Sequence, residues 1–237
     1  GHKLTIDASI SLNKEDEFSN IYGSILETNS FVSDEKSTKI ERQNRNLFQI
    51  DYVLPIKENI QFELGYRGSY TNSGSDYEVI ERVNQNDPYT NVPEFTNNFE
   101  YIENVSAFYT QFGTKFFNKL SVLAGLRFEN TNLDINQLLT NDLNKRNYNN
   151  LFPSLFFTYE VNDDTNFSLN YSKRISRPRD RFINPFSSIT SNTNLFIGNP
   201  KLNPALTDAF DIGYLRKWDK ITLSTSAYYN HTTDSFQ

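Results

Sequence analysis

Residues 59–69 read NIQFELGYRGS, and their side chains alternate strictly between apolar and polar. In an extended chain, successive side chains point to opposite faces, so this segment has one apolar face and one polar face. The apolar face carries Ile60, Phe62, Leu64 and Tyr66, and the polar face carries Gln61, Glu63 and Arg67. Because charge is confined to one face, the segment is predicted to be a β-strand between an apolar environment and water.

The same period of two recurs along the chain. Further strands are predicted near residues 4–12, 46–56, 120–129, 154–161, 167–174, 210–214 and 221–227. Residues 99–116 are also strand-like, but their facing stays open because apolar residues occupy both sides. The pattern therefore predicts about nine strands, with the segment at 59–72 included.

The connections between these strands alternate between short and long. The short ones are predicted at 55–59, 117–119, 162–165 and 217–220, and the long polar ones at 13–45, 73–98, 132–150 and 176–205. Outer-membrane barrels have short periplasmic turns and long external loops, whereas a Greek-key sandwich has no such regularity. The sequence predicts an all-β protein, an antiparallel up-and-down transmembrane β-barrel in a bacterial outer membrane, with lipid as its surroundings.

Composition excludes several other classes of protein. The net charge of the 237 residues is −6, which argues against a nucleic-acid partner. The mean hydropathy is −0.62, and no long apolar run is present, which excludes a membrane-spanning helix. The absence of Cys excludes thiolate metal sites, disulfides and a cysteine nucleophile.

Catalytic and metal-binding patterns are weak. Apart from His2, the only histidine is His231, which lies near Asp234 and Ser235, but proximity in sequence does not make a catalytic triad. Asp163 and Asp164 lie between two alternating segments and indicate a hairpin turn. No spacing resembles a calcium-binding loop. We therefore predict no catalytic residue, no metal site, no cofactor and no enzymatic activity.

The polar face of a barrel surrounds its lumen, where charged side chains can pair, contact a plug domain or line a solute path. The alternation places seven charged residues on this face. The lumen-facing candidates are Glu63, Arg67, Arg127, Glu129, Glu160, Arg174 and Asp211.

Two stretches near the C-terminal end form a longer motif. Residues 170–186 read NYSKRISRPRDRFINPF, and residues 198–214 read GNPKLNPALTDAFDIGY. This arrangement resembles the signature of TonB-dependent outer-membrane receptors, and is most similar to the outer-membrane β-barrel family common in Bacteroidetes. Shorter pieces at 59–69, 124–129 (AGLRFE) and 152–154 (FPS) support the resemblance. Where the family commonly has Glu after the last proline of the motif, this chain has Ala205.

The motif also has a physical interpretation. Its prolines fix φ and remove backbone donors, and its Gly-Asn pair favours a turn, so we predict an ordered, chiefly structural loop. The arginines of this segment are expected to bind neighbouring backbone or carboxylates, with attraction of an anionic solute or of lipopolysaccharide phosphate as the alternative. The residues assigned to this structural loop motif are Arg174, Arg177, Pro178, Asn184, Pro185, Phe186, Gly198, Asn199, Pro200 and Pro204.

The resemblance implies energised import of a scarce solute, such as a metal chelate, a vitamin or a glycan. The partners that it implies are a plug domain and TonB, and a surface lipoprotein is a further candidate partner. A second hypothesis is a β-rich surface adhesin or assembly module that binds a partner through its long loops and transports nothing. An outer-membrane hydrolase is a third, which the scarcity of histidine disfavours.

The chain is expected to be a single partial barrel domain over residues 1–237, without a plug domain. Gly1 and His2 are interpreted as residues left by cloning. The first strand is predicted to begin on the short-turn side and the last to stop on the long-loop side. An odd number of strands leaves two open edges, so we expect an incomplete barrel that cannot transport by itself.

Overall fold

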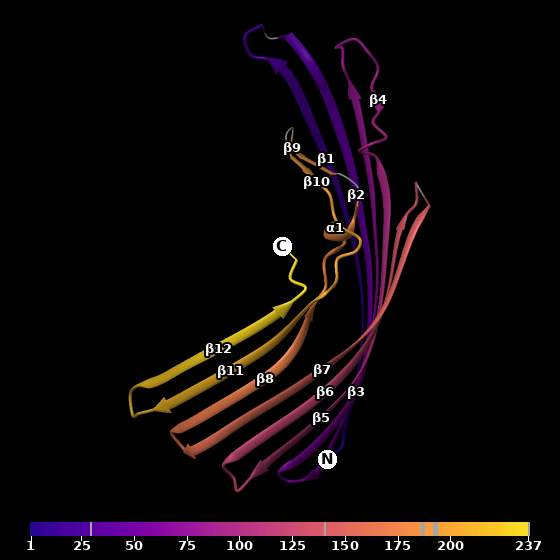
Figure 1. The fold of residues 1–237 in the computed structure, drawn as a ribbon. Helices are drawn as coiled ribbons and strands as arrows, with labels where there is room; N and C mark the ends of the chain where they lie inside the picture. The colour runs from indigo at the N-terminus through magenta and orange to yellow at the C-terminus, as the bar shows by residue number, and fades with distance from the viewer. Residues whose placement is uncertain (29, 140, 186–187, 192–193, 237) are drawn as a thin grey trace.

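The computed structural model describes residues 1–28, 30–139, 141–185, 188–191 and 194–236, without the side chains of 188–191 and 194–195. Its main feature is one curved antiparallel sheet (Figure 1). The nine long strands are β1 (Lys3–Ile25), β2 (Ser30–Lys57), β3 (Ile60–Arg82), β5 (Asn97–Phe116), β6 (Leu120–Gln137), β7 (Asp142–Asn162), β8 (Thr165–Ser176), β11 (Ala205–Lys217) and β12 (Thr222–Thr233). The minor elements are β4 (Thr90–Asn91), which pairs with β3, helix α1 (Asp180–Ile183), and a hairpin of β9 (Ser188–Ser191) and β10 (Asn194–Phe196).

The long strands follow one another in space in the order of the sequence, β1-β2-β3-β5-β6-β7-β8-β11-β12. This up-and-down order and the number of long strands confirm the predicted fold class. Within the described chain the sheet does not close, because β1 pairs only with β2 and β12 only with β11. No described helix is long and apolar enough to cross a membrane.

The predicted short turns are confirmed, but three of the four predicted long loops are wrong. Residues 13–45 continue the β1–β2 ladder up to the pair Ile25 and Ser30, and most of 132–150 extends β6 and β7. Of 73–98, only the segment between β3 and β5 leaves the main ladder. Beyond a membrane the outer face of a strand also meets water, so these extensions need no apolar outer face, while the ladder still pairs their backbone groups.

The fourth predicted loop is confirmed, because residues 177–204 leave the sheet between β8 and β11. We call this segment the inner loop. Near its start, β8 also parts from β7: their pairing runs from Asn162 and Thr165 only as far as Ser154 and Ser172. Figure 1 shows β8 bending away from β7 and the inner loop, with α1, β9 and β10, folding back over the hollow side of the sheet.

Strand register settles the facing that the sequence left open in β5. Phe108 pairs with Tyr66 and Phe128, and Phe112 pairs with Phe62, so these phenylalanines share the apolar outer face. Their neighbours on β5 therefore lie on the opposite, inner face, which also carries the charged residues of β3 and β6.

The outer face is an exposed apolar band that extends upward from the short turns. Leu4, Leu64, Leu169 and Ile212 are 49–60% exposed there. Exposed apolar surface of this extent marks contact with a membrane or another apolar surface.

Outward-facing asparagines mark the upper limit of this band. Asn104 of β5, Asn132 of β6 and Asn147 of β7 lie in one register row. Asn147 donates to Asn132 at 2.5 Å, and Asn130 donates to Asn149 at 2.8 Å. Amide side chains are costly in hydrocarbon, so this row lies at or beyond the lipid boundary.

A polar cluster joins the extension of β2 to that of β3. Asp34 accepts hydrogen bonds from the Tyr89 hydroxyl at 2.6 Å and from Arg82 Nη2 at 2.7 Å. The Tyr89 hydrogen bond, followed by the contribution of Arg82, holds the pKa of Asp34 below its ordinary value. The segment that connects β3 to β5 is thereby tied to the extensions.

We predict that spin labels at Leu64 and Arg67 will show opposite accessibility to a lipid-soluble quencher. A one-residue register shift would place every inner charge in lipid, at about 2–4 kcal/mol for an arginine at mid-plane. Electron paramagnetic resonance in liposomes should show quenching at position 64 and protection at 67. The pair Leu126 and Arg127 serves as an independent repeat, and equal accessibility within both pairs would contradict the facing.

Candidate functional site

The seven charged residues predicted to face the lumen share the inner face of the sheet. Arg67, Ala107 and Glu129 lie in one register row, and Gly65, Tyr109 and Arg127 lie in the next. The row of Glu63 and Gln111 lies one step nearer the short turns. At the level of the turns, Lys115 forms an ion pair with Glu160 at 2.9 Å, and farther along the sheet Asn170 donates to Asp211 at 3.1 Å.

The structure brings one of these carboxylates together with an arginine of the inner loop. Arg177 Nη2 donates to Glu129 Oε2 at 2.6 Å and to Thr131 Oγ1 at 3.0 Å, and its Nε lies 3.5 Å from Glu103 Oε1. Arg127 Nε donates to Glu129 Oε1 at 2.5 Å. The Glu129 side chain is only 7% exposed, so two guanidinium groups hold a nearly buried carboxylate. We call these four charged residues the Arg177 cluster.

An apolar contact lies beside this cluster. Ile183 of α1 is 1% exposed and packs against Phe99, Tyr101, Leu133 and Ile135 on the inner faces of β5 and β6. Burial of apolar side chains against the sheet adds a hydrophobic contribution to the ion pairs. The inner loop is therefore attached to the sheet by both kinds of interaction.

The two halves of the sequence motif meet inside the inner loop. Gly198 N–H donates to the Asn184 carbonyl at 2.8 Å, and Asn199 N–H donates to the Phe182 carbonyl at 2.7 Å. A Cβ at position 198 would overlap the Asn184 carbonyl oxygen and lie 2.7 Å from the Phe182 carbonyl. Only glycine allows this close backbone approach.

The remaining motif residues have separate places. Pro178 is buried, Pro185 is half-buried, Pro200 lies in a turn and Pro204 directly precedes β11. Arg174 is exposed and donates to Ser172 at 3.1 Å. Phe186 lies outside the described residues.

Sequence reasoning missed two residues that hold the inner loop. Glu103 lies in the segment whose facing was left open, and the register of β5 against β3 places it on the inner face. Arg146 of β7 donates to the Leu202 carbonyl at 2.5 Å and to Asn203 Oδ1 at 2.6 Å. Nothing in the polar sequence around Arg146 distinguishes it from a solvated cation.

No group of three or more His, Asp or Glu side chains suited to a metal ion occurs among the described residues. The chemistry that this inner face offers is hydrogen bonding and charge pairing. Such a surface can hold a folded segment or line a path for a polar solute.

An antiparallel sheet with an apolar outer band and a polar inner face defines a class of protein, the outer-membrane β-barrels. The model of the outer membrane protein beta-barrel family matches residues 1–237. The chain belongs to this family and is a protein of the outer membrane. Among curated proteins, none matches the sequence.

Solved structures of larger barrels share the fold. The copper transporter OprC is 12% identical, with a TM-score of 0.67 over 96% of this chain and 35% of its own. The unliganded ferric citrate transporter FecA is 13% identical, with a TM-score of 0.55 over 96% of this chain and 34% of its own. The ferric yersiniabactin receptor FyuA from Yersinia pestis is 14% identical, with a TM-score of 0.53 over 97% of this chain and 34% of its own. This chain thus spans about a third of the length of these proteins.

We predict that Arg177→Ala will lower the free energy of unfolding by about 3 kcal/mol, because it leaves the nearly buried Glu129 and Glu103 short of a partner. Denaturant unfolding in detergent micelles measures the change. Arg174→Ala is the matched control, since the same residue type is exposed three positions earlier and should change stability by less than about 0.5 kcal/mol. Equal losses in the two variants would show that the Arg177 cluster does not anchor the loop.

We predict that Gly198→Ala will loosen the inner loop without unfolding the sheet. The added Cβ must push apart the two backbone segments that Gly198 and Asn199 join. Hydrogen–deuterium exchange should rise at residues 180–184 and stay unchanged in β5 and β6. Gly74→Ala is the control, because a Cβ there comes no closer than 3.9 Å to a neighbour. Unchanged exchange at 180–184 would rule out this role for Gly198.

Proposed function

We propose that this chain forms part of the barrel of a TonB-dependent outer-membrane transporter that imports a scarce solute, such as a metal chelate, a vitamin or a glycan. The observation that carries the proposal is the inner loop, which leaves the sheet beyond the apolar band and is bound to the polar inner face. A barrel that is only an anchor has no need of an ordered segment folded over its interior. The family and the likeness to transporter barrels support the same reading.

The proposal gives two roles to four of the seven residues predicted to face the lumen. Glu129, with Glu103 and Arg127, holds the inner loop through Arg177, while Glu63 and Arg67 lie below it on the same face. A plug domain is the partner expected against this lower part of the face, with TonB as the source of energy and a surface lipoprotein as a further partner.

The strand extensions favour a second candidate function. The β1–β2 hairpin continues well past the asparagine row, and its far end carries the exposed apolar residues Phe18 and Leu26. Such a projection suits a surface module that binds a partner protein without transport. Transport depends on TonB as its source of energy, whereas binding of a partner protein at the surface does not.

We predict that cells expressing the full-length protein will accumulate one of three labelled probes, ferric citrate, cobalamin or a maltooligosaccharide, and that deletion of TonB will abolish the accumulation. The matched control is a variant that lacks residues 13–43 of the β1–β2 projection, which should keep uptake if transport is the function. Surface binding without accumulation for all three probes, unaffected by TonB, would contradict transport and favour the surface module.

A further inference from the structure

A large cavity lies between the strand extensions and the inner loop. One wall is the inner face of β1, β2, β3 and β5 beyond the asparagine row, and the other is the inner loop at α1 (Figure 1). Its volume is about 690 Å³. Pockets that hold small ligands measure about 300–1,000 Å³. The cavity lies away from the short turns, on the external side of an outer-membrane barrel.

The sheet wall carries an excess of negative charge. Glu17 and Lys39 share one inner-face row, and Glu15 and Glu41 share the next row toward the membrane. Lys39 Nζ is bound to Glu41 Oε1 at 2.5 Å, and neither Glu15 nor Glu17 forms an ion pair among the described residues. Like charges directly opposite each other on neighbouring strands are destabilising, so the fold gains nothing from the Glu15–Glu41 pair.

The loop wall carries an excess of positive charge. Arg179 and Arg181 line the cavity, and both are exposed. The Arg181 guanidinium lies over the ring of Phe196, which also lines the cavity, at 4.9 Å from its centroid. The one carboxylate on this side is Asp180, whose Oδ1 accepts from the Arg181 backbone N–H at 2.8 Å. Two guanidinium groups therefore stand beside one carboxylate.

The charges of the two walls do not meet. Within the described chain, no ion pair joins β1 or β2 to the inner loop. The remaining charged residue that lines the cavity, Arg42, is bound to Asp76 at 2.6 Å. The cavity is thus negative on the sheet side and positive on the loop side.

A buried acceptor without a partner lies in the sheet wall. Asn97 lines the cavity in the same inner-face row as Glu17 and Tyr77, and is 3% exposed. Its Oδ1 atom accepts no hydrogen bond from any described residue. Buried polar atoms are nearly always paired, so this oxygen calls for a donor that the described chain does not supply.

We propose that this cavity binds a short peptide whose two ends are free and charged. The ammonium end lies at Glu15 and Glu17, and the carboxylate end lies at Arg179 and Arg181, where charge-assisted hydrogen bonds hold each end. A backbone N–H between the ends donates to Asn97. A neutral occupant would leave both walls without partners. The site goes beyond the proposed transport function and is compatible with a transporter or a surface module.

The test measures binding of trialanine to the full-length protein in detergent by isothermal titration calorimetry at low salt. The ligand control is trialanine with an acetylated amino end and an amidated carboxyl end, which has no charge. We expect trialanine to bind and the doubly blocked peptide not to bind. Glu17→Gln and Arg181→Gln should each weaken trialanine binding about tenfold, the usual effect of losing one charge-assisted hydrogen bond.

Trialanine blocked at one end tests which wall holds which end. The acetylated peptide lacks the ammonium group, so Arg181→Gln should weaken its binding about tenfold and Glu17→Gln by less than about twofold. The amidated peptide lacks the carboxylate and should show the reverse. Equal effects of both variants on both peptides would overturn the site.

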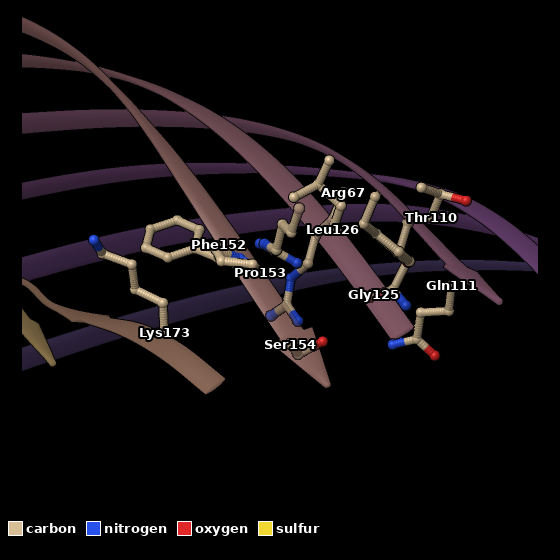
Figure 2. A pocket seen from close by; sticks show the side chains of 12 residues that line it. Arg67, Thr110, Gln111, Gly125, Leu126, Phe152, Pro153, Ser154 and Lys173 are labelled. Carbon is tan, nitrogen blue, oxygen red and sulfur yellow. The ribbon is translucent and has the colours of Figure 1, made fainter. Parts of the chain in front are cut away.

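Two matched variants control for general electrostatic attraction. Glu78→Gln removes an exposed carboxylate of the β3 extension that does not line the cavity. Arg67→Gln removes a guanidinium from a smaller inner-face cavity of about 380 Å³ nearer the short turns (Figure 2). Each should change trialanine affinity by less than about twofold, the scale of a distant, screened charge. Losses as large as those of Glu17→Gln and Arg181→Gln would overturn the site, and so would absence of trialanine binding.

A double-mutant cycle on the peptide-free protein tests whether the two walls bind each other instead. We expect Glu17→Gln, Arg181→Gln and the double variant to show additive effects on thermal unfolding, because the two side chains are not in contact. Non-additive losses of stability would show that the opposite charges close the loop onto the sheet, and would overturn the peptide site.

Discussion

The structure depends on one constraint: within hydrocarbon, every backbone N–H and C=O group must find a partner in the protein. A strand meets this requirement only through ladders on both sides, which is why the strands from β1 to β7 run side by side in continuous ladders. The same constraint decides to which face each side chain points, because a pleated strand that faces lipid on one side must face the interior on the other. One strand register therefore places the leucines and isoleucines on the outer face and the charged residues on the inner face.

The constraint relaxes at the asparagine row, and the structure changes there. Asn132 and Asn147 place amide groups on the face that Leu126 and Phe157 cover lower down. Above this level water can satisfy a backbone group, so the chain can form the inner loop. β8 has already parted from β7 nearer the short turns, at Ser154 and Ser172. That loop would be costly in lipid, since its backbone groups bond only in part to one another. It is attached by side chains, through Arg177 and Ile183, where the strands below are attached by their backbones.

Strand number and order, and the facing of every strand except β5, could be predicted because the period of two is local and each strand carries its own copy. The length of the strands could not, because residues such as those at 13–45 are polar on both faces, and polar segments form loops or water-exposed strands equally well. The bounds of the inner loop followed from its prolines, but its attachment did not. Glu103 and Arg177 are distant in sequence and meet only through the register of three strands and the direction in which the loop folds. Arg146 carries no local signal at all, since its partners are a carbonyl and an amide of the loop.

The parting of β7 and β8 at Ser154 and Ser172 has a mechanical consequence. When a pulling force acts parallel to the strands, a ladder of backbone hydrogen bonds resists separation as a unit, because all of its bonds must break together. The inner loop is not part of such a ladder where it meets the sheet, so a pull on it is borne first by a few ion pairs and one small apolar contact, which yield one at a time. The loop can therefore be drawn off the inner face at a force that leaves the barrel wall intact. The inner loop can therefore detach from and return to the sheet while the strands stay paired.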